Sequence, residues 1–442
     1  MDTRSTRIAP GRATAGCRRG RSAIGHGAVM AALVVTALAQ AAGPDEAALL
    51  LADEAPGLVE RASDWRVFAE GAVGALVRRS DGATRDARRL ALDIRYDHAF
   101  TPDWRFFLAN RLDMAWPEPG GEPGIHTLKE AYATWRMQPE TLLDLGRINV
   151  RNGVAMGYNP TDFFRAGALR SIVSISPASL RENRQGSLML RGQRLWEDGS
   201  LTWLYSPELS RRSSPEGFNL DPGATNSRHR ALVAVSQKVS PSLSPQFLIY
   251  REQALPTQFG LNLTGLINDA TVAHLEWSGG RGPSLLARAL PRAAPGSAGD
   301  PWQNRLAAGL TYTTPNNISL TAEYHYSGGG LDETGWAALR QGPLPLYGQY
   351  RNWLRTAQEQ PTRQAFFFHG VWQDALVSRL DLSVMYNRDL IDASHRLWLE
   401  ARYHREKVEY ALQWQMNGGQ PLSAWGALPE SRGWQAVLRC YL

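Results

Sequence analysis

Six arginines lie between residues 145 and 184 of this 442-residue chain. Over 151–184, five arginines stand against two acidic residues, which gives a net charge of +3. A guanidinium stays charged at neutral pH and binds carboxylates and phosphates, so this stretch favours the attraction of anions. The candidate residues in and beside it are Arg147, Arg151, Asp162, Arg165, Arg170, Arg181 and Arg184. The structural alternative is that these arginines simply pair with nearby carboxylates.

Nucleophilic catalysis is the other chemistry to weigh, and its best candidate is the pair His325 and Ser327. A catalytic serine needs a histidine base and an orienting group close by. The other histidines are scattered, serine is common, and no G-x-S-x-G is present. We therefore predict no enzyme and keep an outer-membrane hydrolase as a third hypothesis. The two cysteines, Cys17 and Cys440, offer no metal-ligand spacing, so neither a metal nor a cofactor is predicted.

Strands must position these residues, because apolar and polar side chains alternate from Trp65 to the end of the sequence. In 395–404, Leu397, Leu399 and Tyr403 alternate with polar residues. A period of two places each kind on its own face of a strand. About eighteen segments show the pattern, with 14–16 strands as the alternative: 66–79, 86–98, 104–116, 128–138, 141–150, 185–197, 199–206, 227–239, 245–254, 259–266, 270–278, 302–314, 318–327, 363–374, 379–390, 394–405, 407–417 and 432–442.

The connections between these segments alternate in length. Every second connection is short: 101–103, 138–140, 197–199, 240–244, 267–269, 314–317, 374–378 and 405–406. The others are mostly longer: 117–127, 151–184, 207–226, 279–301, 328–362 and 418–431. Bacterial outer-membrane barrels have this asymmetry, and a soluble sandwich gives no reason for it. The sequence therefore predicts an all-β fold, a transmembrane antiparallel β-barrel over 65–442 with short periplasmic turns and long extracellular loops.

The first forty residues have the pattern of an export signal. A basic region precedes an apolar run at 28–39, and Ala39-Gln40-Ala41 offers small residues for cleavage. We predict a signal peptide at 1–41 and a periplasmic segment at 42–64. Removing 1–41, with its six arginines and one aspartate, lowers the net charge from +6 to +1. A nearly neutral mature chain argues against a nucleic-acid partner.

The architecture of 65–442 resembles that of a Gram-negative outer-membrane porin. The stretch 145–170 also resembles the G-R…G…N-P-x-D segment of alginate-export-like and related porin-like families. Its matching positions are Gly146, Arg147, Gly153, Asn159, Pro160 and Asp162. In those families the segment ends a strand and begins a long loop, either extracellular or folded into the lumen. The resemblance implies a place in the cell outer membrane.

A closed barrel of about 16–18 strands encloses a water-filled lumen, where charged side chains and a narrowing loop select solutes. The loop 151–184 is the candidate constriction, since Tyr158, Phe163 and Phe164 suit it to pack against the wall. Lumen-facing candidates on the polar strand faces are Arg95, Arg105, Arg111, Asp113, Arg305, Glu323, Arg379, Asp381 and Arg402.

We therefore predict a porin-like channel for passive diffusion of small hydrophilic solutes, with anion preference as a further hypothesis. Its expected partners are these solutes, outer-membrane lipid and the barrel-assembly machinery, and the oligomeric state stays open. The alternative is a non-conducting barrel that acts in binding or assembly through its external loops. One such loop, 328–362, is rich in Tyr and Trp, whose rings could stack on a sugar or a partner. We favour the alternative that this loop forms a helical cap over the rim of the barrel.

Overall fold

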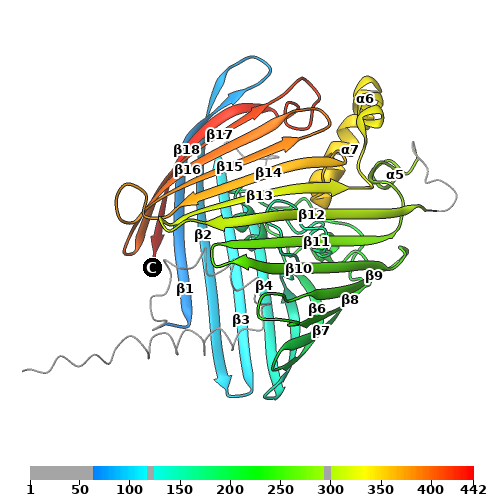
Figure 1. Ribbon diagram of the computed structural model, residues 1–442. Helices are drawn as coiled ribbons and strands as arrows, with labels where there is room; N and C mark the ends of the chain where they lie inside the picture. Colours follow the sequence, from blue (N-terminus) through cyan, green and yellow to red (C-terminus); the bar gives the residue numbers. More distant parts are fainter. Residues whose placement is uncertain (1–62, 117–123, 293–299) are drawn as a thin grey trace, which may run out of the picture. The chain divides into compact units, whose positions relative to one another are not determined.

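The computed structural model describes residues 63–116, 124–292 and 300–442, so the predicted signal peptide and nearly all of the predicted segment 42–64 lie outside the described residues. Eighteen antiparallel strands form one sheet, which closes because β1 pairs with both β2 and β18 (Figure 1). This confirms the predicted barrel, with eighteen strands and not 14–16. The strands are β1 (Trp65–Arg78), β2 (Thr84–Thr101), β3 (Trp104–Trp116), β4 (Ile125–Gln138), β5 (Thr141–Ile148), β6 (Ser187–Trp196), β7 (Gly199–Ser206), β8 (Arg230–Gln237), β9 (Gln246–Glu252), β10 (Gln258–Asn268), β11 (Thr271–Arg281), β12 (Trp302–Thr313), β13 (Ile318–Ser327), β14 (Gln364–Trp372), β15 (Leu380–Asp389), β16 (His395–Arg405), β17 (Val408–Gly418) and β18 (Glu430–Tyr441).

The two faces of the sheet differ in polarity, as the alternating pattern requires. In β1, the inward-facing Glu70 is 5% exposed, whereas the outward-facing Val73 is 56% exposed. Buried charges lie on the inner face, and exposed Leu, Val, Phe, Trp and Tyr side chains lie on the outer face. An apolar outside and a polar inside are the arrangement of an outer-membrane barrel, whose outer face contacts lipid.

Connections after even-numbered strands are short, and the opposite end of the sheet carries the long ones. The longest described connection joins β5 to β6 over residues 149–186, which we call the inward loop. The helices lie in the long connections: α3 (Pro177–Glu182), α4 (Pro222–Thr225), α5 (Leu285–Ala289), α6 (Glu333–Gln341) and α7 (Leu344–Ala357). None of the helices in these described ranges is both long and apolar enough to cross a membrane.

Helices α6 and α7 fold the connection between β13 and β14 into a small packed unit (Figure 1). The aromatic residues Trp336, Tyr347 and Tyr350 are buried there with Leu354, against Leu285 of α5. Because packing uses these rings, they are not free to stack on a ligand. The segment thus adopts the helical alternative, and we call this unit the helical cap.

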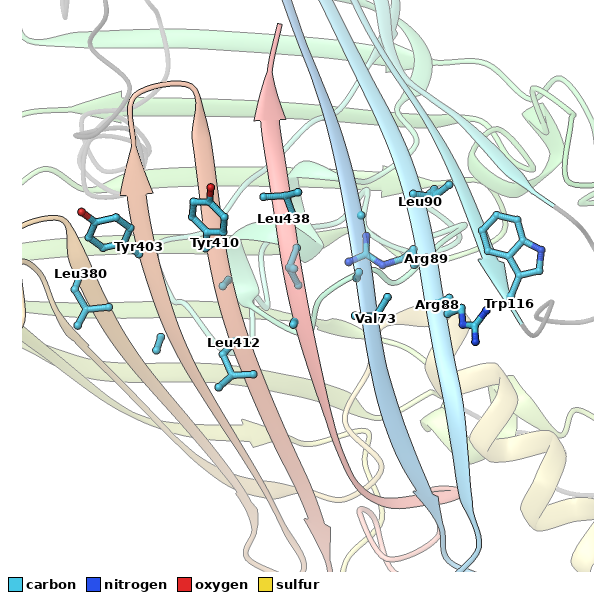
Figure 2. Close-up of a pocket in the computed structure, with 16 residues that line it drawn as sticks. Val73, Arg88, Arg89, Leu90, Trp116, Leu380, Tyr403, Tyr410, Leu412 and Leu438 are labelled. Atoms are coloured by element: carbon cyan, nitrogen blue, oxygen red, sulfur yellow. The ribbon is translucent and has the colours of Figure 1, made fainter.

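A shallow apolar hollow of about 1000 Å³ lies on the outer face around the junction of β18 and β1. Figure 2 shows Tyr410, Leu438 and Leu90 spread over neighbouring strands of this surface. Gly71 and Ala436 lie between these larger side chains and leave the space above the sheet. The hollow belongs to the lipid-facing surface and not to the interior.

Candidate functional site

The inward loop is bound to the inner wall through Glu276 of β11. One carboxylate oxygen of Glu276 accepts from the backbone N–H groups of Val154 at 3.0 Å and Ala155 at 3.1 Å, and from the Asn159 amide at 3.2 Å. Its other oxygen accepts from the Thr161 backbone N–H at 2.7 Å and hydroxyl at 2.9 Å. Glu276 is fully buried, so these five hydrogen bonds replace the water that its charge would otherwise need.

A second carboxylate, Glu323 of β13, binds the next residues of the loop. It accepts from the backbone N–H groups of Met156 at 2.6 Å and Gly157 at 2.9 Å. Its two oxygens also contact His274 at 2.9 Å and His325 at 2.8 Å. Four consecutive N–H groups, from 154 to 157, are therefore shared between two buried glutamates of the wall.

Two glycines allow this close approach. Gly153 has φ 103°, and a Cβ atom there would lie 2.5 Å from a carboxylate oxygen of Glu276. At Gly157 a Cβ atom would lie 2.5 Å from the Phe367 ring. The first position needs glycine for its backbone conformation, and both need it for space. The glycine of the 145–170 motif thus has a steric reason in this chain.

Aromatic residues pack the loop against the wall. Phe163 stacks on Tyr250 of β9 with ring centroids 4.5 Å apart, and Phe164 meets the same ring edge-on at 5.9 Å. At two other points of the loop, Met156 and Ile175 pack against the buried side chains of Phe367, Met385 and Trp398, which lie on β14–β16. The loop therefore crosses the interior from β5 to the opposite strands.

Two predicted constriction arginines are neutralised by carboxylates. Arg165 Nη2 lies 2.7 Å from Oε1 of Glu359, which follows α7 in the sequence. Arg165 Nε also donates to the carbonyl of Gln358 at 3.1 Å. Arg184 pairs with Asp162 inside the loop, where the Asp162 side chain is fully buried. These pairs follow the structural alternative for the arginine-rich stretch, because their charges are cancelled locally.

Arg170 and Arg147 lie beside the connection 207–229. Arg170 is 3.8 Å from Asp221 and donates to the carbonyl of Glu216 at 2.6 Å. Arg147 lies on β5, where it pairs in register with Leu188. Arg147 is 6% exposed and lies close enough to Arg170 and Asp221 for their charges to interact. Its assignment to the constriction stays a prediction.

Arg151 and Arg181 complete the predicted constriction set. Arg181, in α3, donates to the carbonyls of Asn152 at 3.3 Å and Gly153 at 3.4 Å. It forms no ion pair within the described ranges, so its positive charge is not cancelled by a carboxylate. Arg151 is half-buried at the start of the loop, close enough to Arg95 for their charges to interact.

The inner wall of β1–β4 carries a chain of buried charges. Arg111 lies 3.0 Å from Asp113 and 3.6 Å from both Glu70 and Asp93, and Lys129 lies 2.5 Å from Asp93. Sequence reasoning selected Arg111 and Asp113 as candidates but missed Glu70 and Lys129. Lys129 is one of few lysines in an arginine-rich chain, and this was a signal that the sequence offered.

The remaining lumen-facing candidates fall into two groups. Most form ion pairs on the inner wall: Arg95 with Glu182, Arg105 with Asp97, Arg305 with Glu359, Asp381 with His404, and Arg402 with Glu400 and Glu409. Arg379 is different, because it is an exposed turn residue with φ 70° between β14 and β15. Its placement on a lumen-facing strand is wrong, since the turn ends one residue later than the alternation predicts.

The ionisation of the loop anchor Glu359 is set by its neighbours. Burial would raise the pKa of this carboxyl, but the charges of Arg165 and Arg305 outweigh burial and hold the pKa below its ordinary value near 4.5. Burial raises the pKa of the Tyr158 hydroxyl, which donates to Glu359 at 3.0 Å. At neutral pH this group is therefore a carboxylate held by two arginines and one phenol.

The pair His325 and Ser327 does not form a nucleophile and base. Both side chains are buried, at 2% and 0% exposure. His325 contacts Glu323 through Nε2 and Gln360 through Nδ1, at 2.8 and 3.0 Å. Both ring nitrogens already have partners, so neither is free to act as the base for Ser327 that a hydrolase needs.

Comparison with known proteins places the fold. No family model matches the sequence, and no curated protein does either. Among solved structures, Pseudomonas aeruginosa OpdL is 14% identical with a TM-score of 0.53, over 86% of this chain and 99% of that one. Acinetobacter baumannii OccAB2 is 11% identical with a TM-score of 0.53, over 86% and 98% of the two chains. P. aeruginosa OccK8 (OprE) is 11% identical with a TM-score of 0.52, over the same shares.

These neighbours are Occ and Opd outer-membrane porins, and at this identity the likeness concerns the fold. The narrower resemblance to alginate-export-like families finds no support among them. The neighbours are not enzymes, which agrees with the arrangement of His325 and Ser327. The chain is therefore an outer-membrane, porin-like β-barrel of eighteen strands.

Proposed function

We propose that this protein is a passive channel for small hydrophilic solutes. The observation that carries the proposal is the inward loop, which crosses the interior of a closed barrel and narrows it. A polar inner wall supports the same conclusion, because water and polar solutes need hydrogen-bonding groups along their path. The fold shared with Occ and Opd outer-membrane channels adds further support.

We propose a modest preference for anions. Most arginines of the loop and wall are paired with carboxylates, as at Arg165 with Glu359 and Arg184 with Asp162, so they add little net field. Arg181 is an exception among the described residues, since the hydrogen bonds that it donates there go to backbone carbonyls. An uncancelled cation at a constriction favours anions without excluding neutral solutes.

Single-channel recording in a planar bilayer tests this proposal. With a potassium chloride gradient across the membrane, we expect stepwise currents and a reversal potential displaced slightly toward that of chloride. A reversal potential on the cation side would contradict the anion preference alone. A correctly folded barrel that gives no current, and that fails to admit sugars in a liposome-swelling assay, would overturn the channel proposal itself.

A non-conducting barrel is the second candidate, and one observation favours it. Asp93, Arg111 and Lys129 are at most 2% exposed, which shows that side chains and loop fill part of the interior. If they fill all of it, the protein acts through its external loops, such as the helical cap. The same recording separates the two candidates, because this one requires a folded and silent barrel.

A further inference from the structure

We propose that Glu276 and Glu323 are positioning residues that hold the constriction of this channel at a single width. We call the two glutamates, with the backbone N–H groups of 154–157 and 161, the latch. This inference rests on the proposed channel function and extends it to residues that do not touch the solute. The inference concerns the steadiness of the pore, whereas the loop arginines concern its charge preference.

The latch is built from acceptors on the wall and donors on the loop. Glu276 and Glu323 lie on β11 and β13, on either side of β12, and both side chains are at most 1% exposed. Together they accept from five backbone N–H groups of the loop, and within the described residues no ion pair joins either glutamate to an arginine or lysine. Without such an ion pair, Glu276 depends on the loop for all five of its hydrogen bonds, and Glu323 depends on the loop for two of its four.

Moving the loop away from this part of the wall would therefore break hydrogen bonds to buried carboxylates. If residues 154–161 moved toward the lumen, Glu276 would lose all five of its hydrogen bonds at once. Glu323 would lose the N–H groups of Met156 and Gly157, although its two histidines would remain. This asymmetry makes Glu276 the stronger half of the latch, because every hydrogen bond that it accepts within the described residues comes from the loop.

Substitution by glutamine tests the latch with little change in shape. Both oxygens of Glu276 accept from N–H groups, so one end of a glutamine amide would place its own N–H groups against those of the loop. In E276Q we expect additional conductance levels and a several-fold rise in open-channel current noise. In E323Q the same effect should appear but be smaller, because the histidines partly retain the side chain.

E400Q is the matched control. Glu400 lies on the inner wall of β16, bonded to Arg402 and Gln413, and its substitution changes the charge of the interior by the same amount. We expect E400Q to shift the reversal potential while keeping one steady level. If Glu276 acts only through its charge, or only in folding, the current traces of E276Q should be as steady as those of E400Q. Equally steady traces would overturn the inference.

A disulfide tether supplies the rescue. The Thr161 hydroxyl lies 2.9 Å from Oδ1 of Asn262 on β10, so T161C with N262C puts two thiols on facing residues, in a C440S background that removes the free cysteine of the described residues. Added to E276Q, the oxidised tether should restore a single level, and reduction should abolish the rescue. If oxidised and reduced channels behave alike although the disulfide forms, the loop position does not set the pore, and the inference fails.

Trypsin separates the failure of this inference from the failure of the channel proposal. If the wild type is silent, the channel proposal fails, and cleavage after Arg151 or Arg181 in the refolded barrel then reports release of the loop directly. Faster cleavage of E276Q than of E400Q would support the latch as the device that holds the loop. Equal cleavage would overturn it.

Discussion

Arg165 of the inward loop and Glu359, two residues beyond α7, form a buried ion pair with a distance of 2.7 Å. The Tyr158 hydroxyl donates to the same carboxylate at 3.0 Å. The contact joins segments 194 residues apart and ties the inward loop to the helical cap. The position of the loop thus depends on the extracellular cap as well as on the strands of the wall.

Acid should weaken this connection. The pKa of Glu359 is held below its ordinary value near 4.5, so the pair contributes stability that is fully present above that value. This contribution is lost as the pH falls through the lower, folded-state pKa, because the unfolded carboxyl binds its proton first. We expect the difference in free energy of unfolding between wild type and E359Q to shrink below pH 4.5, measured by urea unfolding at a series of pH values. A difference that stays constant down to pH 3 would contradict this assignment.

Breaking the buried ion pair between Asp162 and Arg184 should lower the free energy of unfolding more than breaking a surface ion pair does. In D162N, Arg184 keeps its charge at 5% side-chain exposure, so we expect a loss of about 3–5 kcal/mol in the free energy of unfolding. Replacing both residues, as D162N with R184M, should recover much of the loss. Urea unfolding followed by tryptophan fluorescence measures both.

A matched control for this pair is D81N. Asp81 pairs with Arg78, and their side chains are 47% and 52% exposed. Water and salt screen such a pair, so we expect a change below about 1 kcal/mol. Equal effects of D162N and D81N would show that burial of the Asp162 pair does not matter.

The strands were predictable because the period-2 alternation of apolar and polar residues does not depend on which strand pairs with which. The segments 104–116 and 318–327 coincide with β3 and β13, residue for residue. Other ends differ by a few residues: the predicted segment 227–239 became β8 at Arg230–Gln237, where the ends leave the sheet for turns. Alternation marks a face but does not mark where hydrogen bonding stops.

The inward contacts of the loop were not predictable in the same way. Glu276 lies 115 residues from Thr161, and no spacing rule relates the two. What the sequence did contain was an acidic residue at an inward position of β11, two residues from His274 on the same face.

Arg181 should dominate the charge preference of the channel. Its guanidinium binds backbone carbonyls, so R181E replaces an uncancelled positive charge with a negative one at the constriction. We expect the reversal potential in a salt gradient to move toward cations. R379E makes the same charge change at an exposed turn between β14 and β15 and should leave the reversal potential nearly unchanged. A larger shift in R379E than in R181E would place the selective region elsewhere.

Gly153 should tolerate no side chain. Its φ of 103° is unfavourable for other residues, and a Cβ atom would lie 2.5 Å from a carboxylate oxygen of Glu276. We expect G153A to lower the free energy of unfolding by about 1–3 kcal/mol, the usual cost of such strain, and to increase channel noise as the loop shifts. G348A in α7 meets nothing within 4 Å and should stabilise the protein by about 0.5–1 kcal/mol, since alanine favours helix. An unchanged urea midpoint and a steady current in G153A would mean that the loop can bind Glu276 from another conformation.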